Sequence, residues 1–333
     1  MTREMSDSVV VITGASSGIG RATALEFAKE GSRVVLASRN KRALKEAADE
    51  CEELGASTLV VPTDVTDEEE VRSLAEQAVD EFGRIDVWVN NAGVGAYARF
   101  EDTPEEDFRR VIETNLFGCV YGARAVLPYF RKQGRGVLIN VSSQIALGGT
   151  PYTSAYGVSK HGVRALGDSL RQEFVDTDIY ICTLFPASTD TPFFQHAANY
   201  TGREVKPLGS VSSAEQVARE IVSLAREPKP EVLVGAHGYF MSAAHGMAPE
   251  AYDRFIARKT DKDHFKKERA RNRRGNLFSP SRFEAVSGGW GGAGGSIGKA
   301  IAGLGAAAGA GLLLWYSRRR GREKTEGFAR RIA

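Results

Sequence analysis

The sequence has 333 residues, of which 42% are hydrophobic and 26% are charged, and its formal net charge is +2. This length allows one large α/β domain with a buried sheet, with or without an extension. The near-neutral charge excludes a global electrostatic argument for nucleic-acid binding. Three cysteines (Cys51, Cys119 and Cys182), an odd number without paired spacing, argue against a disulfide framework or a metal site and fit a reducing compartment.

Short runs rich in β-branched residues alternate with longer helical stretches along the first two thirds of the chain. Strands that are apolar throughout are buried on both faces, as in a parallel sheet, and strand–helix alternation produces right-handed crossovers. The sequence therefore predicts an α/β fold with a doubly wound parallel sheet of about seven strands. The predicted strands begin at or near Val9, Arg33, Thr58, Asp86, Gly136, Ile179 and Glu231.

A glycine-rich turn, TGASSGIG, follows the first predicted strand and precedes a predicted helix. Glycines at 14, 18 and 20 let the backbone turn tightly and approach a pyrophosphate, which would rest on the helix N-terminus. A plain strand–helix turn is the alternative, but the strand before it and the helix after it are the context that nucleotide binding requires. The predicted cofactor contacts here are Gly14, Ser16, Ser17, Gly18, Ile19 and Gly20.

Residues after the second and third strands bear on the choice of cofactor. An acidic residue at the end of the second strand would hold the ribose hydroxyls of NAD, whereas this chain has Arg39, which suits the extra phosphate of NADP. NADP(H) is therefore favoured over NAD(H), with an ordinary exposed arginine as the alternative. Asp64, followed by Val65, is placed to pair with the adenine amino group; it could instead cap a helix, but Asp67 is better placed as a cap.

NNAG, Asn90 to Gly93, ends the fourth strand, where asparagines can tie neighbouring strands and Gly93 leaves room for a cofactor. The predicted contacts are Asn91, Ala92 and Gly93. Asn115 falls within a helical stretch, where asparagine is a poor helix former. It is either a solvent-facing residue or part of a local helical bulge whose freed carbonyl holds a water.

Tyr156 and Lys160 are spaced i, i+4 and so share one face of a helix. A neighbouring ammonium and a positive nicotinamide ring would favour the phenolate, lower the tyrosine pKa and make Tyr156 a usable acid/base. Ser143, at the end of the fifth strand, can hydrogen-bond a substrate oxygen. The spacing alone is also typical of any amphipathic helix. Together with the serine, the glycine turn and NNAG in order, it indicates a catalytic centre.

This ordered set resembles the main single-domain branch of the short-chain dehydrogenase/reductase family, over residues 7 to 236. The resemblance implies a Rossmann fold, hydride transfer to or from a carbonyl carbon, and a dimer or tetramer formed through long helices. It assigns a catalytic tetrad of Asn115, Ser143, Tyr156 and Lys160, in which Lys160 also holds the nicotinamide ribose and Asn115 a proton-relay water.

One departure from the family pattern follows the sixth strand. The family usually has Pro-Gly there, whereas this chain has Pro186 and Ala187. Thr189 and Thr191 are still placed to reach the carboxamide of the cofactor, so Pro186, Thr189 and Thr191 complete the predicted cofactor contacts.

The segment after Pro186 binds substrate in such enzymes, and here it carries Phe193, Phe194, His196 and Tyr200. Its aromatic character predicts an apolar carbonyl or alcohol substrate. The alternative is that these residues pack on the core as parts of a lid. His196 lacks the partners of a metal site and is expected to be neither ligand nor base. A cofactor-binding scaffold without turnover is the alternative function, although a scaffold does not need an intact tetrad.

The last third of the chain departs from the strand–helix pattern. Ala300 to Tyr316 lacks charged residues, ends in Trp-Tyr and precedes RRRGR, so it could associate with a membrane, pack as a helix on another protein, or be a disordered tail. We expect a cytoplasmic catalytic domain, attached to a membrane if this segment inserts. The predicted divisions are 7–236, a Rossmann domain; 237–287, a helical and basic extension; 288–299, a glycine-rich linker; 300–316, a membrane segment; and 317–333, a basic tail.

Overall fold

A seven-stranded parallel sheet forms the centre of the computed structural model, which describes residues 3–235, 247–281 and 284–291. The strand order is β12-β7-β6-β4-β1-β2-β3, and each strand runs parallel to its neighbours. The predicted doubly wound α/β fold is confirmed. The strands are β1 (Val9–Thr13), β2 (Arg33–Ser38), β3 (Thr58–Pro62), β4 (Val87–Asn90), β6 (Arg135–Val141), β7 (Asp178–Pro186) and β12 (Glu231–Val234).

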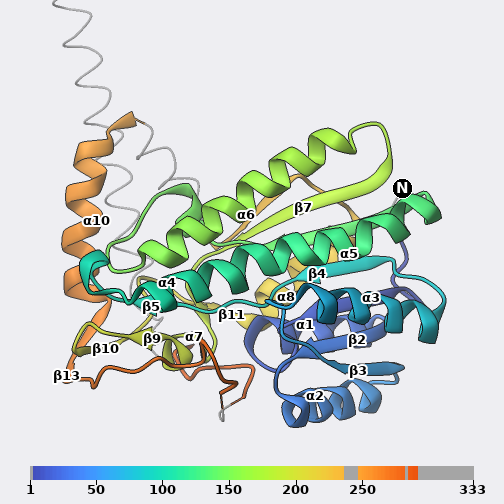
Figure 1. Ribbon diagram of the computed structural model, residues 1–333, viewed down its shortest axis with the longest axis horizontal. Helices are drawn as coiled ribbons and strands as arrows, with labels where there is room; N and C mark the ends of the chain where they lie inside the picture. Colours follow the sequence, from blue (N-terminus) through green and yellow to red (C-terminus); the bar gives the residue numbers. More distant parts are fainter. Residues whose placement is uncertain (1–2, 236–246, 282–283, 292–333) are drawn as a thin grey trace, which may run out of the picture. The chain divides into compact units, whose positions relative to one another are not determined.

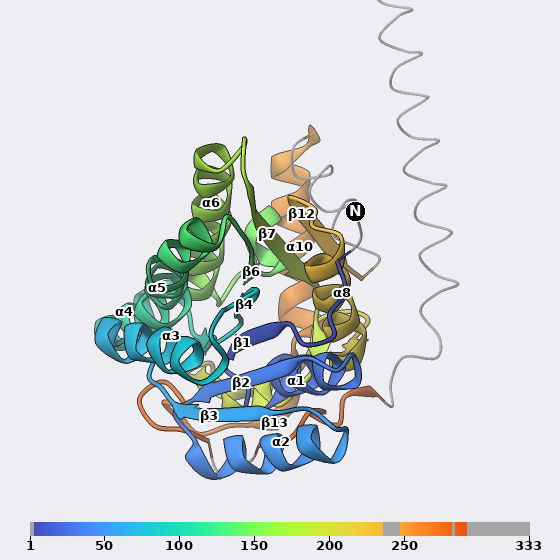
Figure 2. The ribbon, with the colours of Figure 1, turned by 90° about the vertical axis from the view of Figure 1, so that its right-hand side faces the viewer.

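Helices cover both faces of the sheet, as Figure 2 shows. One layer contains α1 (Gly18–Lys29), α2 (Lys41–Glu53) and α8 (Ala214–Arg226). The other contains α3 (Glu68–Phe82), α5 (Gly118–Gln133) and α6 (Ser154–Glu173). A helix on each face is what right-handed crossovers in a doubly wound sheet produce.

The side chains of β1 show how both faces are buried. Val10 and Ile12 belong to the core cluster that includes Phe27 of α1. Val9 and Val11, which alternate with them, belong to the opposite cluster with Phe130 of α5. Because successive side chains of a strand point to opposite faces, a strand covered on both sides is apolar at every position.

Short elements gather beyond the carboxyl ends of the strands (Figure 1). Three pairs of short strands form there: β5 with β9, β8 with β11, and β10 with β13. The elements are β5 (Ala96–Tyr97), η1 (Phe100–Asp102), α4 (Glu105–Ile112), η2 (Glu113–Phe117), η3 (Gln144–Leu147), β8 (Thr189–Asp190), α7 (Phe193–His196), β9 (Ala198–Asn199), β10 (Arg203–Val205) and β11 (Ser212–Ser213).

The extension adds α10 (Pro249–Asp263) and β13 (Phe265–Arg269), so part of the predicted basic stretch forms an antiparallel pair with β10. Residues 300–316 and the basic tail lie outside the described residues. Within the described part of the chain, no helix is both long enough and apolar enough to cross a membrane.

Candidate active site

The glycine turn between β1 and α1 packs tightly against the end of β4. The Asn91 side-chain amide donates to the carbonyl oxygens of Thr13 (2.8 Å) and Gly14 (3.3 Å), and the backbone amide of Asn91 donates to Thr13 Oγ1 at 3.0 Å. A Cβ on Gly20 would lie 2.1 Å from the Gly14 oxygen, and one on Gly14 would lie 2.8 Å from the Ala92 Cα. The turn therefore requires glycine at both positions and keeps the backbone close, as a dinucleotide-binding turn does.

The other asparagine of NNAG, Asn90, links neighbouring strands in the buried sheet. Its side chain donates to Asn140 Oδ1 of β6 at 2.9 Å and accepts from Trp88 Nε1 at 2.7 Å. Both asparagines thus tie strand ends together, as the sequence predicted. Their hydrogen bonds fix the end of β4, after which Ala92 and Gly93 come next in the chain.

Asp64 follows β3 and is bound by its neighbours. Its carboxylate accepts from Thr66 Oγ1 at 2.8 Å and pairs with Arg110 of α4 at 2.6 Å. Burial by itself would raise the pKa of this carboxyl, but the hydrogen bonds from Thr66 and Arg110 outweigh it and lower the pKa. Asp67 caps α3 through the amides of Glu69 and Glu70, as predicted. Asp64 is therefore tied to α4 by an ion pair, and the cap of α3 is Asp67.

Asn115 lies in a π-helical turn, η2, between α4 and α5, which confirms the predicted local bulge. Its side chain is fully buried, accepts from the Val94 amide at 2.8 Å and donates to Ser159 Oγ at 3.0 Å. Its carbonyl oxygen lies 3.2 Å from the Cys119 thiol, which is a weak donor. The solvent-facing alternative is excluded, because this side chain connects the strand end to α6.

Ser143, Tyr156 and Lys160 converge from the end of β6 and the start of α6. The Ser143 and Tyr156 hydroxyls are hydrogen-bonded. The Lys160 ammonium lies 5.7 Å from the Tyr156 ring centroid and donates to the Val141 carbonyl at 2.8 Å. A Cβ on Gly93 would be 3.4 Å from Asn115 Oδ1 and 3.7 Å from Lys160 Nζ. Lys160 therefore lies between the Tyr156 and Ser143 pair and the segment after β4 that carries Gly93 and contacts Asn115.

The pKa of Tyr156 is raised to about 12 by burial, although the hydrogen bond from Ser143 acts in the opposite direction. Burial also lowers the pKa of Lys160. The raised tyrosine pKa is opposite to the lowering expected from the neighbouring ammonium. The physical reason is that burial costs the phenolate its hydration, while the Lys160 ammonium is engaged by the Val141 carbonyl.

Of the aromatic residues after Pro186, Phe193 lies beside Tyr156 and Phe194 packs against the extension. The Phe193 ring lies 5.4 Å from the Tyr156 ring, centroid to centroid. Phe194 is buried against His264 and Trp290 at 6.2 and 5.9 Å. Phe193 thus places an apolar surface beside the tyrosine, whereas Phe194 packs as a lid residue would.

Tyr200 and the threonines occupy other sides of the site. The Tyr200 hydroxyl donates to the buried carboxylate of Asp107 on α4. Thr191 is buried and faces the glycine turn, since a Cβ on Gly18 would lie 3.1 Å from the Thr191 Cβ. Thr189 donates to the Ala187 carbonyl at 2.9 Å. After Pro186, the chain therefore runs from the end of β7 towards the glycine turn.

A segment of the extension also reaches the site, and the sequence did not predict this. Residues 273–281 and 284–291, drawn in orange to red in Figure 1, run along the edge that carries α7 and β9. The Gly18 amide donates to the Ala285 carbonyl at 2.8 Å, and Arg39 donates to the carbonyls of Asn276 and Leu277 at 2.6 and 3.0 Å. No periodicity or motif in the segment signals this placement.

Comparison with known proteins agrees with the geometry. The short chain dehydrogenase family model matches residues 8–200, and the chain belongs to this family. It is 36% identical over 258 residues to the Bacillus subtilis protein described as "Uncharacterized oxidoreductase YxnA", covering 76% of this chain and 72% of that one.

Two of the solved structures that share the fold show the cofactors of the family. An alcohol dehydrogenase from Thermococcus sibiricus in complex with 5-hydroxy-NADP has 30% identity and a TM-score of 0.61, covering 68% of this chain and 95% of that one. A short chain dehydrogenase/reductase from Burkholderia phymatum in complex with NAD has 26% identity and a TM-score of 0.68, covering 75% and 96%. The chain is therefore an oxidoreductase of a family whose members bind NAD or NADP.

Proposed function

We propose that this protein is an NADPH-dependent reductase of apolar carbonyl compounds, catalysing reversible hydride transfer between the nicotinamide and a carbonyl or secondary alcohol. The observation that carries the proposal is the convergence of Ser143, Tyr156, Lys160 and Asn115 beside the glycine turn. A half-buried tyrosine hydrogen-bonded to a serine, with a buried ammonium nearby, is suited to proton transfer at a substrate oxygen.

Each residue has a separate task in this proposal. Tyr156 donates the proton to the substrate oxygen, and Ser143 holds that oxygen by a hydrogen bond. Lys160 would hold the nicotinamide ribose and, with Asn115, would support the path by which the proton is replaced. When bound, the cofactor supplies the hydride and, in its oxidised form, a positive charge that favours the Tyr156 phenolate.

Three features support a dinucleotide along the carboxyl ends of the strands. Gly14 and Gly20 form a turn that side chains would fill, Thr191 faces that turn, and Asp64 lies beyond β3. Arg39 supports NADP(H) over NAD(H), because its guanidinium is a donor for a phosphate and the end of β2 has no acid.

An apolar substrate is supported by the ring of Phe193 beside Tyr156. Contact with such a surface removes apolar area of the substrate from water, and the hydroxyls of Tyr156 and Ser143 then hold its oxygen.

The test is cofactor-linked turnover on a panel of aldehydes, ketones, sterols and acyl carbonyls, run with NADPH and with NADH. We expect NADPH oxidation with at least one apolar carbonyl compound and slower oxidation of NADH. Tight cofactor binding without turnover on any compound would instead support a scaffold or sensor. A clear preference for NADH would contradict the role of Arg39.

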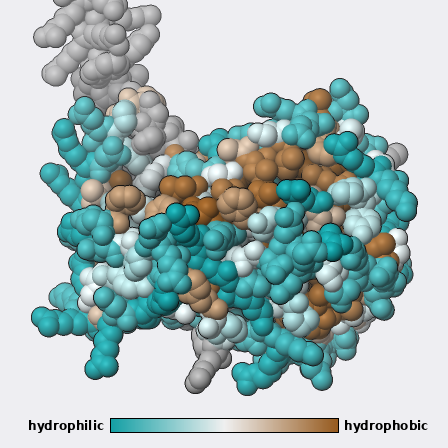
Figure 3. Space-filling view, viewed as in Figure 1, coloured by the Kyte–Doolittle hydropathy of each residue, from teal (hydrophilic) through white to brown (hydrophobic). Residues whose placement is uncertain are grey.

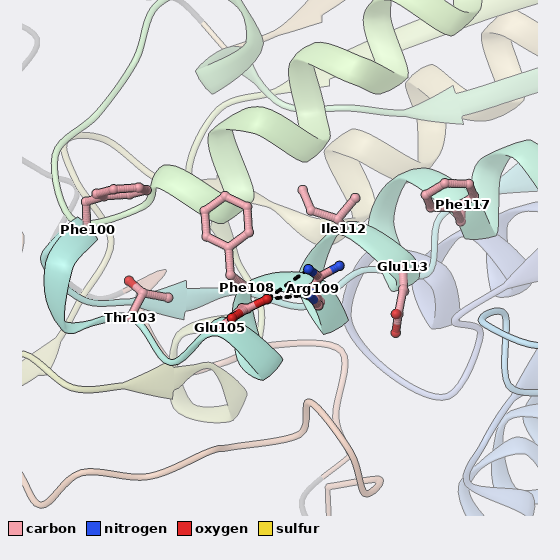
Figure 4. A pocket seen from close by; sticks show the side chains of 8 residues that line it. All are labelled: Phe100, Thr103, Glu105, Phe108, Arg109, Ile112, Glu113 and Phe117. Atoms are coloured by element: carbon pink, nitrogen blue, oxygen red, sulfur yellow. Dashed lines mark hydrogen bonds and ion pairs between the residues drawn. The ribbon is translucent and has the colours of Figure 1, made fainter.

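An apolar surface supports the proposal of a homo-oligomer formed through the long helices. Apolar side chains gather over α5 and α6 (Figure 3). Beside them, a hollow of about 520 Å³ between η1, α4 and η2 is lined by Phe100, Phe108, Ile112 and Phe117 among others (Figure 4). Phe100 is 71% exposed and Phe117 44% exposed. Exposed aromatic side chains of this kind are typical of interfaces.

Membrane association through residues 300–316 remains a proposal based on their composition alone. Fractionation of the full chain beside a version ending at Ser287 tests it. We expect the full chain in the membrane fraction and the shorter version in the supernatant. Recovery of both in the supernatant would contradict membrane association.

A further inference from the structure

The segment 284–291 is bound both by the glycine turn and by β8. At the turn, the Gly18 amide donates to the Ala285 carbonyl, and Val286 packs against a small cluster that includes Ala22 of α1. In β8, the Asp190 carboxylate accepts from the backbone amides of Gly288 (3.0 Å) and Trp290 (2.8 Å). These contacts fix the position of the residue that precedes Ala285.

That residue is Glu284, and its carboxylate lies among the groups at the adenosine end of the proposed cofactor site. Its two oxygens are 3.4 Å from Ser16 Oγ and 3.5 Å from Asn40 Nδ2. Its charge also attracts the Arg39 guanidinium: burial lowers the pKa of Arg39, Asp64 raises it, Arg110 lowers it, and Glu284 adds a smaller rise. A negative group therefore already stands beside the hydroxyl, amide and guanidinium donors that a 2′-phosphate would use.

Arg39 is itself engaged by an earlier part of the extension. Its two terminal nitrogens donate to the carbonyls of Asn276 and Leu277. Backbone carbonyls are neutral acceptors, and an ionised phosphate is a stronger partner for a guanidinium. Arg39 can therefore exchange these carbonyls for a phosphate, but the Glu284 carboxylate would then face a second anion at short range.

We infer that Glu284 is a specificity-determining residue for the cofactor: its carboxylate competes with the 2′-phosphate of NADP(H) and weakens the discrimination against NAD(H) that Arg39 provides. The inference rests on the proposed function. A ribose 2′-hydroxyl can donate a hydrogen bond to a carboxylate, whereas a phosphate at this place is repelled. The acid missing from the end of β2 is thus supplied by the extension.

The test is equilibrium binding of NADPH and NADH, measured by calorimetry or by quenching of protein fluorescence, to the full chain and to Glu284→Gln. The substitution keeps the shape of the side chain and removes its charge. We expect NADPH to bind about tenfold more tightly to the variant and NADH to bind equally or more weakly. The NADH-to-NADPH ratio of dissociation constants should therefore rise about tenfold or more.

The matched control is Glu268→Gln. Glu268 is an exposed residue of β13, so this variant loses the same charge from another part of the extension. Its ratio of dissociation constants should equal that of the unmodified chain. Adenosine 2′,5′-bisphosphate and AMP, used as competing probes, assign the effect to the 2′-phosphate: only the bisphosphate should gain affinity in Glu284→Gln.

Three outcomes overturn the inference. In the first, Glu284→Gln leaves the ratio within threefold of the unmodified chain. In the second, Glu268→Gln changes the ratio as much as Glu284→Gln does. In these two cases both cofactors still bind, so the proposed function stands. In the third, neither cofactor binds any form of the chain, and the proposed function fails together with the inference.

Discussion

At the scale of single residues, burial decides the chemistry of the titratable groups. The sequence spacing placed Tyr156 and Lys160 on one helix face, and the structure brings Ser143 to them. Spacing could not give the direction of the tyrosine pKa, because burial depends on what the rest of the chain places around the phenol. Glu284 shows the same limit: its neighbours Ser16 and Asn40 are more than 240 residues away in the sequence.

His264 is a second buried group whose pKa has a measurable consequence. Burial lowers its pKa from 6.5 to about 4, with a smaller opposing effect from a hydrogen bond to the Lys206 backbone and a further lowering by the Lys206 charge. The folded protein keeps this imidazole neutral, whereas the unfolded chain takes up a proton below pH 6.5. Keeping this imidazole neutral therefore costs no stability above pH 6.5. Below that pH, the free energy of unfolding falls as the pH falls towards 4.

We predict that His264 makes the free energy of unfolding about 2 kcal/mol lower at pH 5 than at pH 7. Urea denaturation of the unmodified chain and of His264→Gln at both pH values measures this. The variant should lose about 2 kcal/mol less than the unmodified chain over this interval. His161→Gln, at an exposed position of α6, is the control and should keep the original loss. An equal loss in His264→Gln and the unmodified chain would refute the prediction.

At the scale of elements, the positions of helices and strands follow the local sequence pattern, but the contacts between distant segments do not. The strand starts, the Asp67 cap and the bulge at Asn115 were all predictable, because they depend on the pattern of apolar residues, on helix capping and on helix propensity. The placement of residues 273–281 and 284–291 was not predictable. They hold their place by hydrogen bonds from distant residues such as Gly18 and Arg39 to their backbone carbonyls, and these bonds leave no pattern in the sequence.

Two glycines within helices should respond oppositely to alanine. A Cβ on Gly122 of α5 would lie 2.1 Å from Asn90 Oδ1, within the buried network of β4, whereas a Cβ on Gly157 of α6 would meet nothing within 4 Å. We predict that Gly122→Ala lowers the free energy of unfolding by about 1–3 kcal/mol. Gly157→Ala should raise it by up to about 1 kcal/mol, since alanine favours the helix.

Chemical denaturation of the two alanine variants beside the unmodified chain provides the comparison. The prediction fails if Gly122→Ala is as stable as the unmodified chain, or if both variants change stability in the same direction.

At the scale of the whole molecule, the family fold occupies most of the described chain, and the extension returns to its site. The doubly wound sheet and its two helical layers could be predicted because apolar runs alternate with helical stretches. The assembly could be expected only from the family resemblance and the exposed apolar side chains, since one chain does not show its partner.

We predict that the protein is a dimer or tetramer and that Phe117→Asp converts it to a monomer. A charge buried in an apolar interface costs free energy without a partner. Light scattering coupled to size-exclusion chromatography measures the mass. Phe255→Asp, at a 60% exposed position of α10, is the matched control and should keep the original mass. A monomeric unmodified chain, or equal masses for the two variants, would contradict the proposed interface.

The most direct test of the proposed catalytic role is turnover by Tyr156→Phe on the best substrate of the carbonyl panel, at saturating NADPH. The variant loses only the hydroxyl, so its dissociation constant for NADPH should stay within about threefold of the original. We predict that kcat falls by about 10³-fold or more, because the hydroxyl that gives the proton is removed. A kcat within tenfold of the unmodified chain, with NADPH still bound, would contradict it.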